Sequence, residues 1–283
     1  MLRIENRILR VARTLFEVPF VELDLNHMLK RRRLDVCCCG LSKTGTHSMA
    51  GIFANYRSRH HPDARVRLRL AIASLKGDLD EDRASEVLRR RDRKLWLEME
   101  SSSLAGILIE PLVQACPKKR FLLTIRDVYS WCNSWIDHNI NRPPHPASGF
   151  AALDRVRLRG GDFPPTKFDA PLTALGFPSL AAYFQLWATH NARVLDAVPA
   201  ERIVVLKTSE IIERIPEIAS WVGAGPGGLS AERGWLDATS KKHNVLGQLD
   251  PSYVQDMAVR FCGGLMERYF PDASLPSPSR CGR

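Results

Sequence analysis

The stretch "LDVCCCGLSKTGTHSM", residues 34–49, joins a short apolar run to a loop of small and polar residues. The apolar run ends at Gly40 and predicts a buried strand, and residues 48–56 predict a helix. A strand, a glycine-bearing loop and a helix in this order are typical of phosphate-binding turns in α/β proteins. A P-loop, however, carries its lysine after the second glycine. Here Lys43 stands two positions before Gly45, so the loop is not an ordinary nucleotide triphosphate loop.

Apolar runs and helical patterns alternate along the rest of the chain. Further strands are predicted at residues 94–99, 120–125 and 202–207. Helices are predicted at residues 80–93, 104–115, 128–138, 180–198, 210–222 and 253–269. This alternation predicts an α/β fold of three layers, α/β/α, with a central parallel sheet.

The domain organisation follows from composition along the chain. Residues 34–270 are expected to form one domain, preceded by a basic amphipathic helix within residues 1–33 and followed by a Pro- and Ser-rich tail at 271–283. Prolines and glycines between residues 139 and 178 predict a long loop or lid that shapes an acceptor pocket. The amphipathic helix would lie on an anionic membrane surface or pack on its own domain.

The charge balance is basic, with 41 Lys and Arg residues against 31 Asp and Glu residues in 283. This balance favours an anionic ligand, an anionic surface or nucleic acid as the partner. The basic runs at residues 31–33, 65–69 and 89–93 lack interleaved aromatic residues, which argues against nucleic-acid binding by base stacking. No apolar run approaches the roughly 20 residues of a membrane-spanning helix.

Seven cysteines include three in a row, residues 37–39, inside the first predicted strand. Neighbouring strand residues point to opposite faces, and no C-x-x-C spacing occurs, so we expect reduced core cysteines, no metal and a cytoplasmic location. His60 and His61 have no partner at metal-ligand spacing and favour a solvated pair. Residues 223–228 fit G-x-G-x-x-G but follow a predicted helix, and Pro226 removes an amide donor, so a dinucleotide site is not expected.

Polar segments follow three of the predicted strands, at residues 40–48, 98–103 and 126–134. Because ligands of parallel sheets bind beyond the carboxyl ends of the strands, these segments are expected to converge on one site. In the first segment, backbone amides, the hydroxyls of Thr44, Thr46 and Ser48, and the ammonium of Lys43 are suited to bind an anion.

This loop resembles the 5′-phosphosulfate loop of the sulfotransferases that use 3′-phosphoadenosine 5′-phosphosulfate (PAPS), commonly K-[ST]-G-T-[TS]. A second motif of that family is an arginine at the end of the third strand, with a serine eight residues later. The two hold the nucleotide's 3′-phosphate. Arg126 and Ser134 stand at this spacing in "TIRDVYSWCNSW". The resemblance covers residues 34–210 and departs from the family pattern at His47, where a second threonine is usual, and at Ser48, where a tryptophan beside the adenine is common.

The resemblance implies an enzyme that moves a sulfuryl group from PAPS to a hydroxyl of a small molecule or a glycan, without a metal. A late basic loop supplies further donor contacts. The implied donor-binding residues are Ser42, Lys43, Thr44, Gly45, Thr46, His47, Ser48, Arg126, Ser134, Lys241 and Lys242.

The transfer also requires a group that stabilises the leaving phosphate and a general base for the acceptor hydroxyl. Lys43 is expected to do the first. For the base, Glu100 matches the family position at the end of the second predicted strand best, Glu98 shares its face, and His47 is a third candidate whose place in the loop favours phosphate contact.

Two other classes of function stay open. A P-loop kinase or NTPase would need G-K-[ST] and a Walker-B aspartate, which the sequence lacks. A non-enzymatic module would bind RNA or an anionic membrane through the basic runs, in a strongly salt-dependent way.

Overall fold

The computed structural model describes residues 31–159, 161–234 and 241–275. The amphipathic helix predicted near the N-terminus and the tail beyond residue 275 lie outside the described residues. Within the described part, a sheet of five parallel strands has the order β2-β3-β1-β4-β5. The strands are β1 (Val36–Cys38), β2 (Ser58–His60), β3 (Met99–Ser101), β4 (Arg120–Ile125) and β5 (Ile203–Lys207). The predicted α/β class with a central parallel sheet is confirmed.

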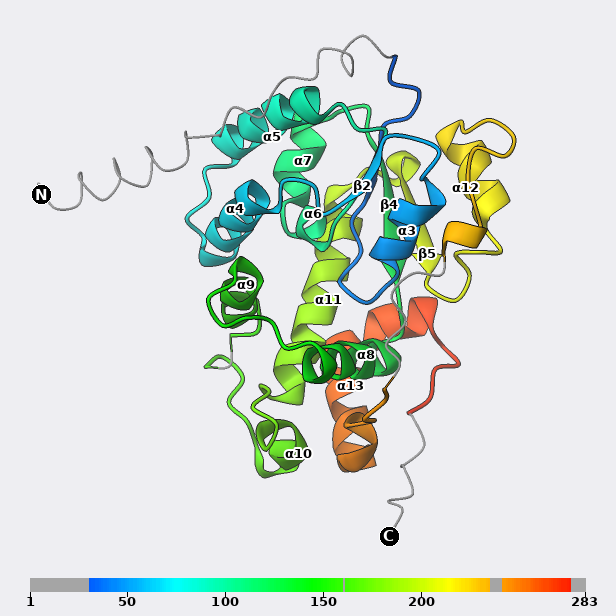
Figure 1. Ribbon diagram of the computed structural model, residues 1–283. Helices are drawn as coiled ribbons and strands as arrows, with labels where there is room; N and C mark the ends of the chain where they lie inside the picture. The colour runs from blue at the N-terminus through cyan, green and yellow to red at the C-terminus, as the bar shows by residue number, and fades with distance from the viewer. Residues whose placement is uncertain (1–30, 160, 235–240, 276–283) are drawn as a thin grey trace, which may run out of the picture.

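Helices cover both faces of this sheet (Figure 1). The helices are α3 (Thr46–Ile52), α4 (Ala64–Lys76), α5 (Glu81–Leu95), α6 (Ser103–Ile107), α7 (Ile109–Ala115), α8 (Val128–Asn141), α9 (Gly149–Arg157), α10 (Ala170–Thr173), α11 (Leu180–Ala197), α12 (Ile215–Val222) and α13 (Pro251–Tyr269). Short 3-10 turns occupy Lys167–Asp169, Ala200–Arg202, Glu232–Gly234 and Leu246–Gln248.

The cysteine triplet demonstrates how β1 holds the layers together. Cys37 and Cys39 belong to the apolar cluster formed with α4, α5, α6 and α7, whereas Cys38 packs in the opposite cluster with α3 and α12. All three thiols are buried and free, as are the other three cysteines among the described residues. The alternation that the sequence predicts for adjacent strand residues is therefore the alternation observed.

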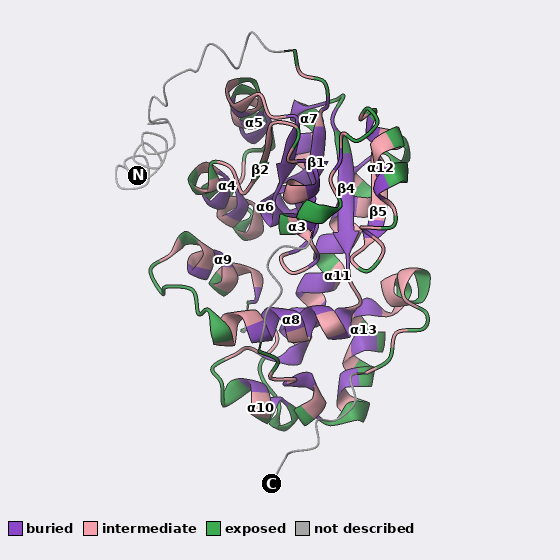
Figure 2. Ribbon diagram, turned by 45° about the vertical axis from the view of Figure 1, so that its right-hand side comes forward, coloured by how far each residue is buried: buried purple, intermediate pink, exposed green. Residues whose placement is uncertain are grey.

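A third apolar cluster lies beyond the carboxyl edge of the sheet. It is built by α8 and α13, which lie below the strands in Figure 1, and by α11, which extends from there up alongside the sheet. α8 is largely buried in Figure 2. Among the described residues, no helix combines the length and apolar character that a membrane crossing requires.

The structure differs from the sequence predictions at several places, of which three bear on the site. The strand predicted at residues 94–99 is wrong in position, because α5 continues to Leu95 and β3 begins at Met99. β2 was not predicted, since its three residues contain no apolar side chain. The region from residue 139 to 178 is not a continuous loop: it contains α9 and α10, and the side chains of Leu153 and Leu172 are fully buried.

Candidate active site

The loop after β1 is fixed from three sides by its neighbours. Thr44 is buried, and its hydroxyl contacts the Thr124 hydroxyl of β4 at 2.8 Å. Thr208, which follows β5, donates to the Thr44 carbonyl at 2.9 Å, and the indole of Trp131 on α8 donates to the Ser42 carbonyl at 3.0 Å. Thr44 therefore anchors the loop from inside and does not face the cavity.

Glycine is required where this loop begins, because a Cβ atom at Gly40 would lie 2.1 Å from the Thr124 hydroxyl oxygen. At the other end Gly45 has a φ of 97°, and between them Lys43 has a φ of 70°. A left-handed conformation costs a non-glycine residue about 1–2 kcal/mol, and such strain concentrates at functional sites. Lys43 thus lies at a sharp turn of the backbone, and its side chain lines the cavity described below.

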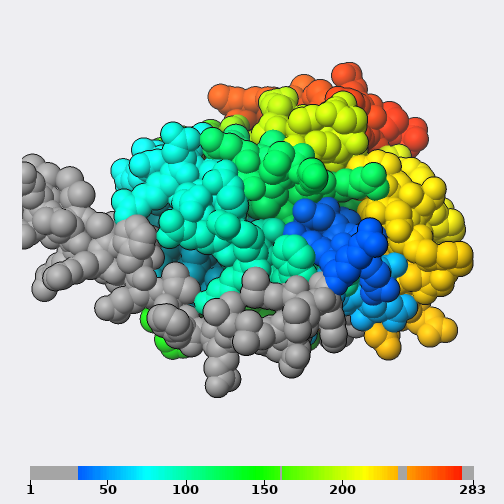
Figure 3. Space-filling view, turned by 90° about the horizontal axis from the view of Figure 1, so that it is seen from above, coloured from blue at the N-terminus to red at the C-terminus, as the bar shows by residue number. Residues whose placement is uncertain are grey.

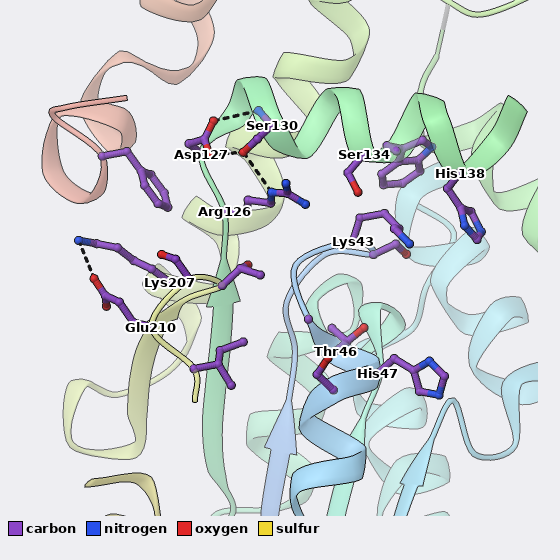
Figure 4. A pocket seen from close by; sticks show the side chains of 18 of the residues that line it. Lys43, Thr46, His47, Arg126, Asp127, Ser130, Ser134, His138, Lys207 and Glu210 are labelled. Carbon is purple, nitrogen blue, oxygen red and sulfur yellow. Dashed lines mark hydrogen bonds and ion pairs between the residues drawn. The ribbon is translucent and has the colours of Figure 1, made fainter. Parts of the chain in front are cut away.

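Arg126 and Ser134 approach the loop from the end of β4 and from α8. The Arg126 guanidinium donates to the Ser130 hydroxyl at 3.0 Å, and the Arg126 carbonyl accepts from the Trp187 indole at 3.0 Å. Arg126 is half-buried, and this burial lowers the pKa of its guanidinium. In Figure 4, Ser134 and His138 project from α8 toward the side of the loop that carries Lys43.

The late basic segment is also brought to this place. Its backbone is held by α8: the His243 amide donates to Asp137 at 2.8 Å, and Asn141 donates to the Lys241 carbonyl at 3.0 Å. Lys242 lines the cavity, whereas Lys241 does not.

These parts enclose a cavity of about 1230 Å³ beyond the carboxyl edge of the sheet. Residues of the loop after β1 and of α8 line it, together with the segment after β5 and residues 269–273 beyond α13. Of the residues expected at the site from sequence, these line the cavity: Ser42, Lys43, Gly45, Thr46, His47, Ser48, Arg126, Ser134 and Lys242. Ser130, His138 and Lys207 join them without having been predicted, and Lys207 pairs with Glu210 at 3.1 Å (Figure 4).

Neither carboxylate expected to be the general base lines this cavity. Glu98 lies at the amino end of β3, where its carboxylate accepts from the backbone amides of Arg33 and Arg57 at 2.9 and 3.1 Å. Glu100 is buried between Arg67 and Arg91, with the Arg91 contact at 2.9 Å. These cations hold the pKa of Glu100 down at about 2, so its carboxylate is a very weak proton acceptor. Neither Glu98 nor Glu100 is therefore in a position to act as the general base expected from the sequence.

His60, the last residue of β2, and His61, which follows it, line the cavity beside the loop after β1. His60 ends β2, its ring stacks on His47 at 4.8 Å between ring centroids, and its Nε2 lies 3.3 Å from the Thr46 hydroxyl. His61 follows, with its ring 4.2 Å from that of His60. All three histidines line the cavity, so the interpretation of His60 and His61 as a solvated pair does not fit the structure.

The environment of His61 keeps its ring neutral. Its Nδ1 lies 2.9 Å from the Ser102 hydroxyl, and its ring meets Phe150 edge-on at 5.3 Å. Burial, and next the nearby cations, lower the pKa of His61 to about 3. An imidazole with this pKa is uncharged at neutral pH. Its basicity is nearly as low as that of Glu100, so position separates the two residues: His61 lines the cavity and Glu100 does not. Among the described residues, no cluster of side chains suits a metal ion.

The one signal that would have found these histidines is topological. β2 pairs in parallel with β3, with Ser58 opposite Met99, so its carboxyl end falls at the same edge as the loop after β1. A three-residue edge strand without apolar residues gives no periodicity from which to infer that pairing.

Comparison with known proteins fits this geometry. Residues 35–215 match the family model described as "Sulfotransferase domain", and the chain therefore belongs to this sulfotransferase family. A crystal structure of sulfotransferase STF9 from Mycobacterium avium shares the fold, with a TM-score of 0.51 at 12% identity over 90% of this chain and 81% of that one.

A second sulfotransferase structure, from Alicyclobacillus acidocaldarius, aligns with a TM-score of 0.42 at 13% identity, over 86% of this chain and 98% of that one. The comparison with curated proteins gives no match.

Proposed function

We propose that the protein is a PAPS-dependent sulfotransferase that transfers a sulfuryl group to a hydroxyl of a small-molecule or glycan acceptor. The observation that carries the proposal is the convergence of Lys43, Arg126 and Ser134 on one cavity. Lys43 comes from the loop after β1, Arg126 from the end of the neighbouring strand β4, and Ser134 from α8. These are the residues that the resemblance to PAPS-dependent enzymes assigns to the donor. A cavity of about 1230 Å³ is also larger than a typical single-ligand pocket of roughly 300–1,000 Å³, so it suits a donor and an acceptor together.

The donor's two charged ends have separate partners in this proposal. Lys43, Thr46 and the loop amides bind the 5′-phosphosulfate, while Arg126, Ser134 and Lys242 bind the 3′-phosphate. All five side chains line the cavity. Thr44 supports the loop through Thr124 and does not touch the donor.

The reaction is an in-line displacement at sulfur. The acceptor oxygen forms a bond to sulfur as the bond from sulfur to the 5′-phosphate oxygen breaks, and 3′,5′-diphosphoadenosine leaves. Lys43 stabilises the charge that develops on the leaving oxygen. The acceptor's proton passes to a base within hydrogen-bond reach.

We assign that base to His61. In the tautomer that donates Nδ1–H to Ser102, Nε2 keeps its lone pair for the acceptor hydroxyl. Its ring stands beside Phe150 on α9, a residue that also lines the cavity. The low pKa of the empty site would rise when the anionic donor binds nearby, because opposite charge favours the imidazolium.

Calorimetry tests the donor assignment. The protein should bind 3′,5′-diphosphoadenosine more tightly than ATP with Mg²⁺, and removal of the 3′-phosphate should weaken binding. Tighter, Mg²⁺-dependent binding of ATP would contradict the proposal and favour a P-loop kinase or NTPase.

Turnover of labelled PAPS with a panel of hydroxyl acceptors tests the base and identifies the acceptor. His61→Gln should lower turnover by about 10²- to 10⁴-fold while 3′,5′-diphosphoadenosine binds as before. His47→Gln is the matched comparison, because His47 lines the cavity from an exposed position in the loop. A larger loss of turnover in His47→Gln would transfer the base to that residue.

The buried free thiols suit a reducing compartment, and we place the reaction in the cytoplasm.

A further inference from the structure

The turn that presents His60 and His61 is strained. His61 and Asp63 have φ values of 48° and 52°, in the left-handed region that non-glycine residues rarely adopt. Pro62 lies between them, and a residue before proline prefers an extended conformation, which makes the conformation of His61 costlier still. Two such residues in one turn persist only when surrounding contacts hold them.

The contacts that hold this turn come from a buried charge cluster behind it. Arg91 on α5 donates to the Pro62 carbonyl at 2.7 Å, and its Nε lies 3.7 Å from the Asp63 carboxylate. The same guanidinium donates to Glu100 at 2.9 Å. Glu100 also contacts Arg67 of α4, and the side chains of Arg67, Arg91 and Glu100 are 1%, 6% and 6% exposed. The Glu100 carboxylate thus binds both Arg67 and Arg91, and Arg91 also donates a hydrogen bond to the turn.

Burying this cluster of charges lowers the stability of the fold. Two nitrogens of Arg67 and the Nε of Arg91 are buried without a hydrogen-bond partner among the described residues. A buried donor without a partner costs about 1–3 kcal/mol, and apolar residues often replace a buried ion pair without loss of stability. Stability alone therefore does not explain the unpaired arginine nitrogens, whereas the hydrogen bond from Arg91 to the turn explains where this arginine is placed.

We propose that Glu100 and Arg91 are positioning residues for the base: Glu100 orients Arg91, and Arg91 holds the strained turn so that His61 faces the cavity. This inference rests on the proposed function and goes beyond it, since neither side chain touches the site itself. It also gives Glu100 a part in the reaction that does not require proton transfer.

The test distinguishes the positive charge of Arg91 from the ability of its guanidinium to donate to two acceptors at once. Arg91→Lys keeps a cation for Glu100 but cannot donate to Glu100 and the Pro62 carbonyl in the same geometry. Glu100→Gln removes the charge that orients Arg91. Glu98→Gln is the matched control, because it neutralises a buried, arginine-bound glutamate of similar exposure next to the same strand, at the opposite edge of the sheet.

The first readout is the histidine ring itself, followed by long-range ¹H–¹⁵N NMR across a pH titration. In the native protein the His61 ring should titrate low, and in Arg91→Lys its pKa should rise toward 6.5, because a released turn exposes the ring. Glu100→Gln is not used for this readout, because loss of the Glu100 charge by itself lowers the pKa of His61. The charged and polar groups that face this ring are His60, Ser102, Arg67, Glu100 and Arg157. An unchanged His61 titration in Arg91→Lys, or an equal shift in Glu98→Gln, would overturn the inference.

The second readout is PAPS turnover compared with affinity for 3′,5′-diphosphoadenosine. Arg91→Lys and Glu100→Gln should lose about 10-fold or more in turnover with affinity unchanged, while Glu98→Gln keeps both. Equal loss of affinity and turnover in the Arg91→Lys variant would indicate a merely structural role. The NMR readout needs no donor, so a wild-type protein that fails to bind 3′,5′-diphosphoadenosine would refute the proposed function and leave the positioning of His61 independently measurable.

Discussion

At the amino edge of the sheet, Lys119 contacts the carboxylates of Asp35 and Asp92, the latter at 2.9 Å, and Arg33 and Arg57 both bind Glu98. Seen from above in Figure 3, this edge carries the first described residues (dark blue) between the cyan helices and the yellow segment around α12. At the carboxyl edge, the Arg126 guanidinium donates to a hydroxyl, and Lys43 lines a cavity.

The difference separates charges that pair with one another inside the fold from charges that line a cavity. At the amino edge Arg32, Arg57 and Lys119 each have a carboxylate within 4 Å. At the carboxyl edge cations, hydroxyls and some carboxylates line a cavity, and the proposed anionic donor would use the cations and hydroxyls. Substitutions at the two edges should therefore affect different measurements.

The largest effect is expected for Lys119→Met at the amino edge. This change leaves two carboxylates with one cation fewer in a buried setting, which should lower the free energy of unfolding by about 3–5 kcal/mol. Urea unfolding measures it. Lys118→Met, at the exposed neighbour, should change stability by less than about 0.5 kcal/mol. Affinity for 3′,5′-diphosphoadenosine should be unchanged in both variants. A weakened affinity in Lys119→Met would contradict the statement that the amino edge affects stability and not ligand binding.

Next comes Lys43→Ala at the carboxyl edge. Loss of a preorganised cation beside the leaving oxygen should reduce turnover by about 10²- to 10³-fold, equivalent to about 3–4 kcal/mol. Urea unfolding should be nearly unchanged, because Lys43 lies in a loop held by other residues. Turnover of labelled PAPS is the measurement, with Lys118→Ala as control. Normal turnover in Lys43→Ala would show that Lys43 has no role in the transfer reaction.

Acid should act through the buried carboxylates. The pKa of Asp92 lies at about 2 instead of 3.8, and that of Glu100 at about 2 instead of 4.5, because cations hold both carboxylates charged. A depressed folded-state pKa stabilises the fold above the unfolded pKa and loses this stabilisation as pH falls toward the folded value. Each group should therefore contribute on the order of 2–3 kcal/mol that disappears between about pH 4.5 and 2.

Urea unfolding from pH 7 to 2 measures this dependence. Asp92→Asn should start less stable and fall less steeply with acid. A variant curve parallel to the native curve would show that Asp92 is not one of the groups responsible.

The smallest effect is expected for Ser134→Ala. Loss of one hydroxyl contact to the 3′-phosphate should weaken binding of 3′,5′-diphosphoadenosine by about 2- to 10-fold, or about 0.5–1.5 kcal/mol. Calorimetry with adenosine 5′-phosphosulfate, which lacks the 3′-phosphate, is the control and should give equal affinities for the two proteins. Equal weakening of both nucleotides would place Ser134 elsewhere than at the 3′-phosphate.

Local sequence was sufficient for the parts of the site that follow apolar strands. β1 and β4 are read from continuous apolar runs, and the topology rule for parallel sheets then brings Lys43 and Arg126 to one edge. Lys242 was expected from a basic loop, and α8 holds that loop at the cavity.

Glu100 illustrates what local sequence could not give. The pairing register sets Cys37 beside Glu100, and Cys37 faces the helical layer of α4 and α5. The side chain of Glu100 accordingly enters that layer, where it meets Arg67 and Arg91, and not the cavity. Residues i and i+2 of a strand share a face, but this rule does not predict whether helices or a cavity lie against that face. β2 was missed for a related reason, since its place comes from pairing with β3 and not from its own residues.

The lining of the cavity has a consequence for synthesis of the protein. Its residues extend along the chain from Ser42 to Ala273, and the closing wall at residues 269–273 follows α13, which packs in one apolar cluster with α8 and α11. A nascent chain still on the ribosome could form β1 and its loop early, yet would have no closed cavity until α13 had emerged and docked. A ligand of this cavity should thus bind only to molecules in which α13 has been translated and has docked.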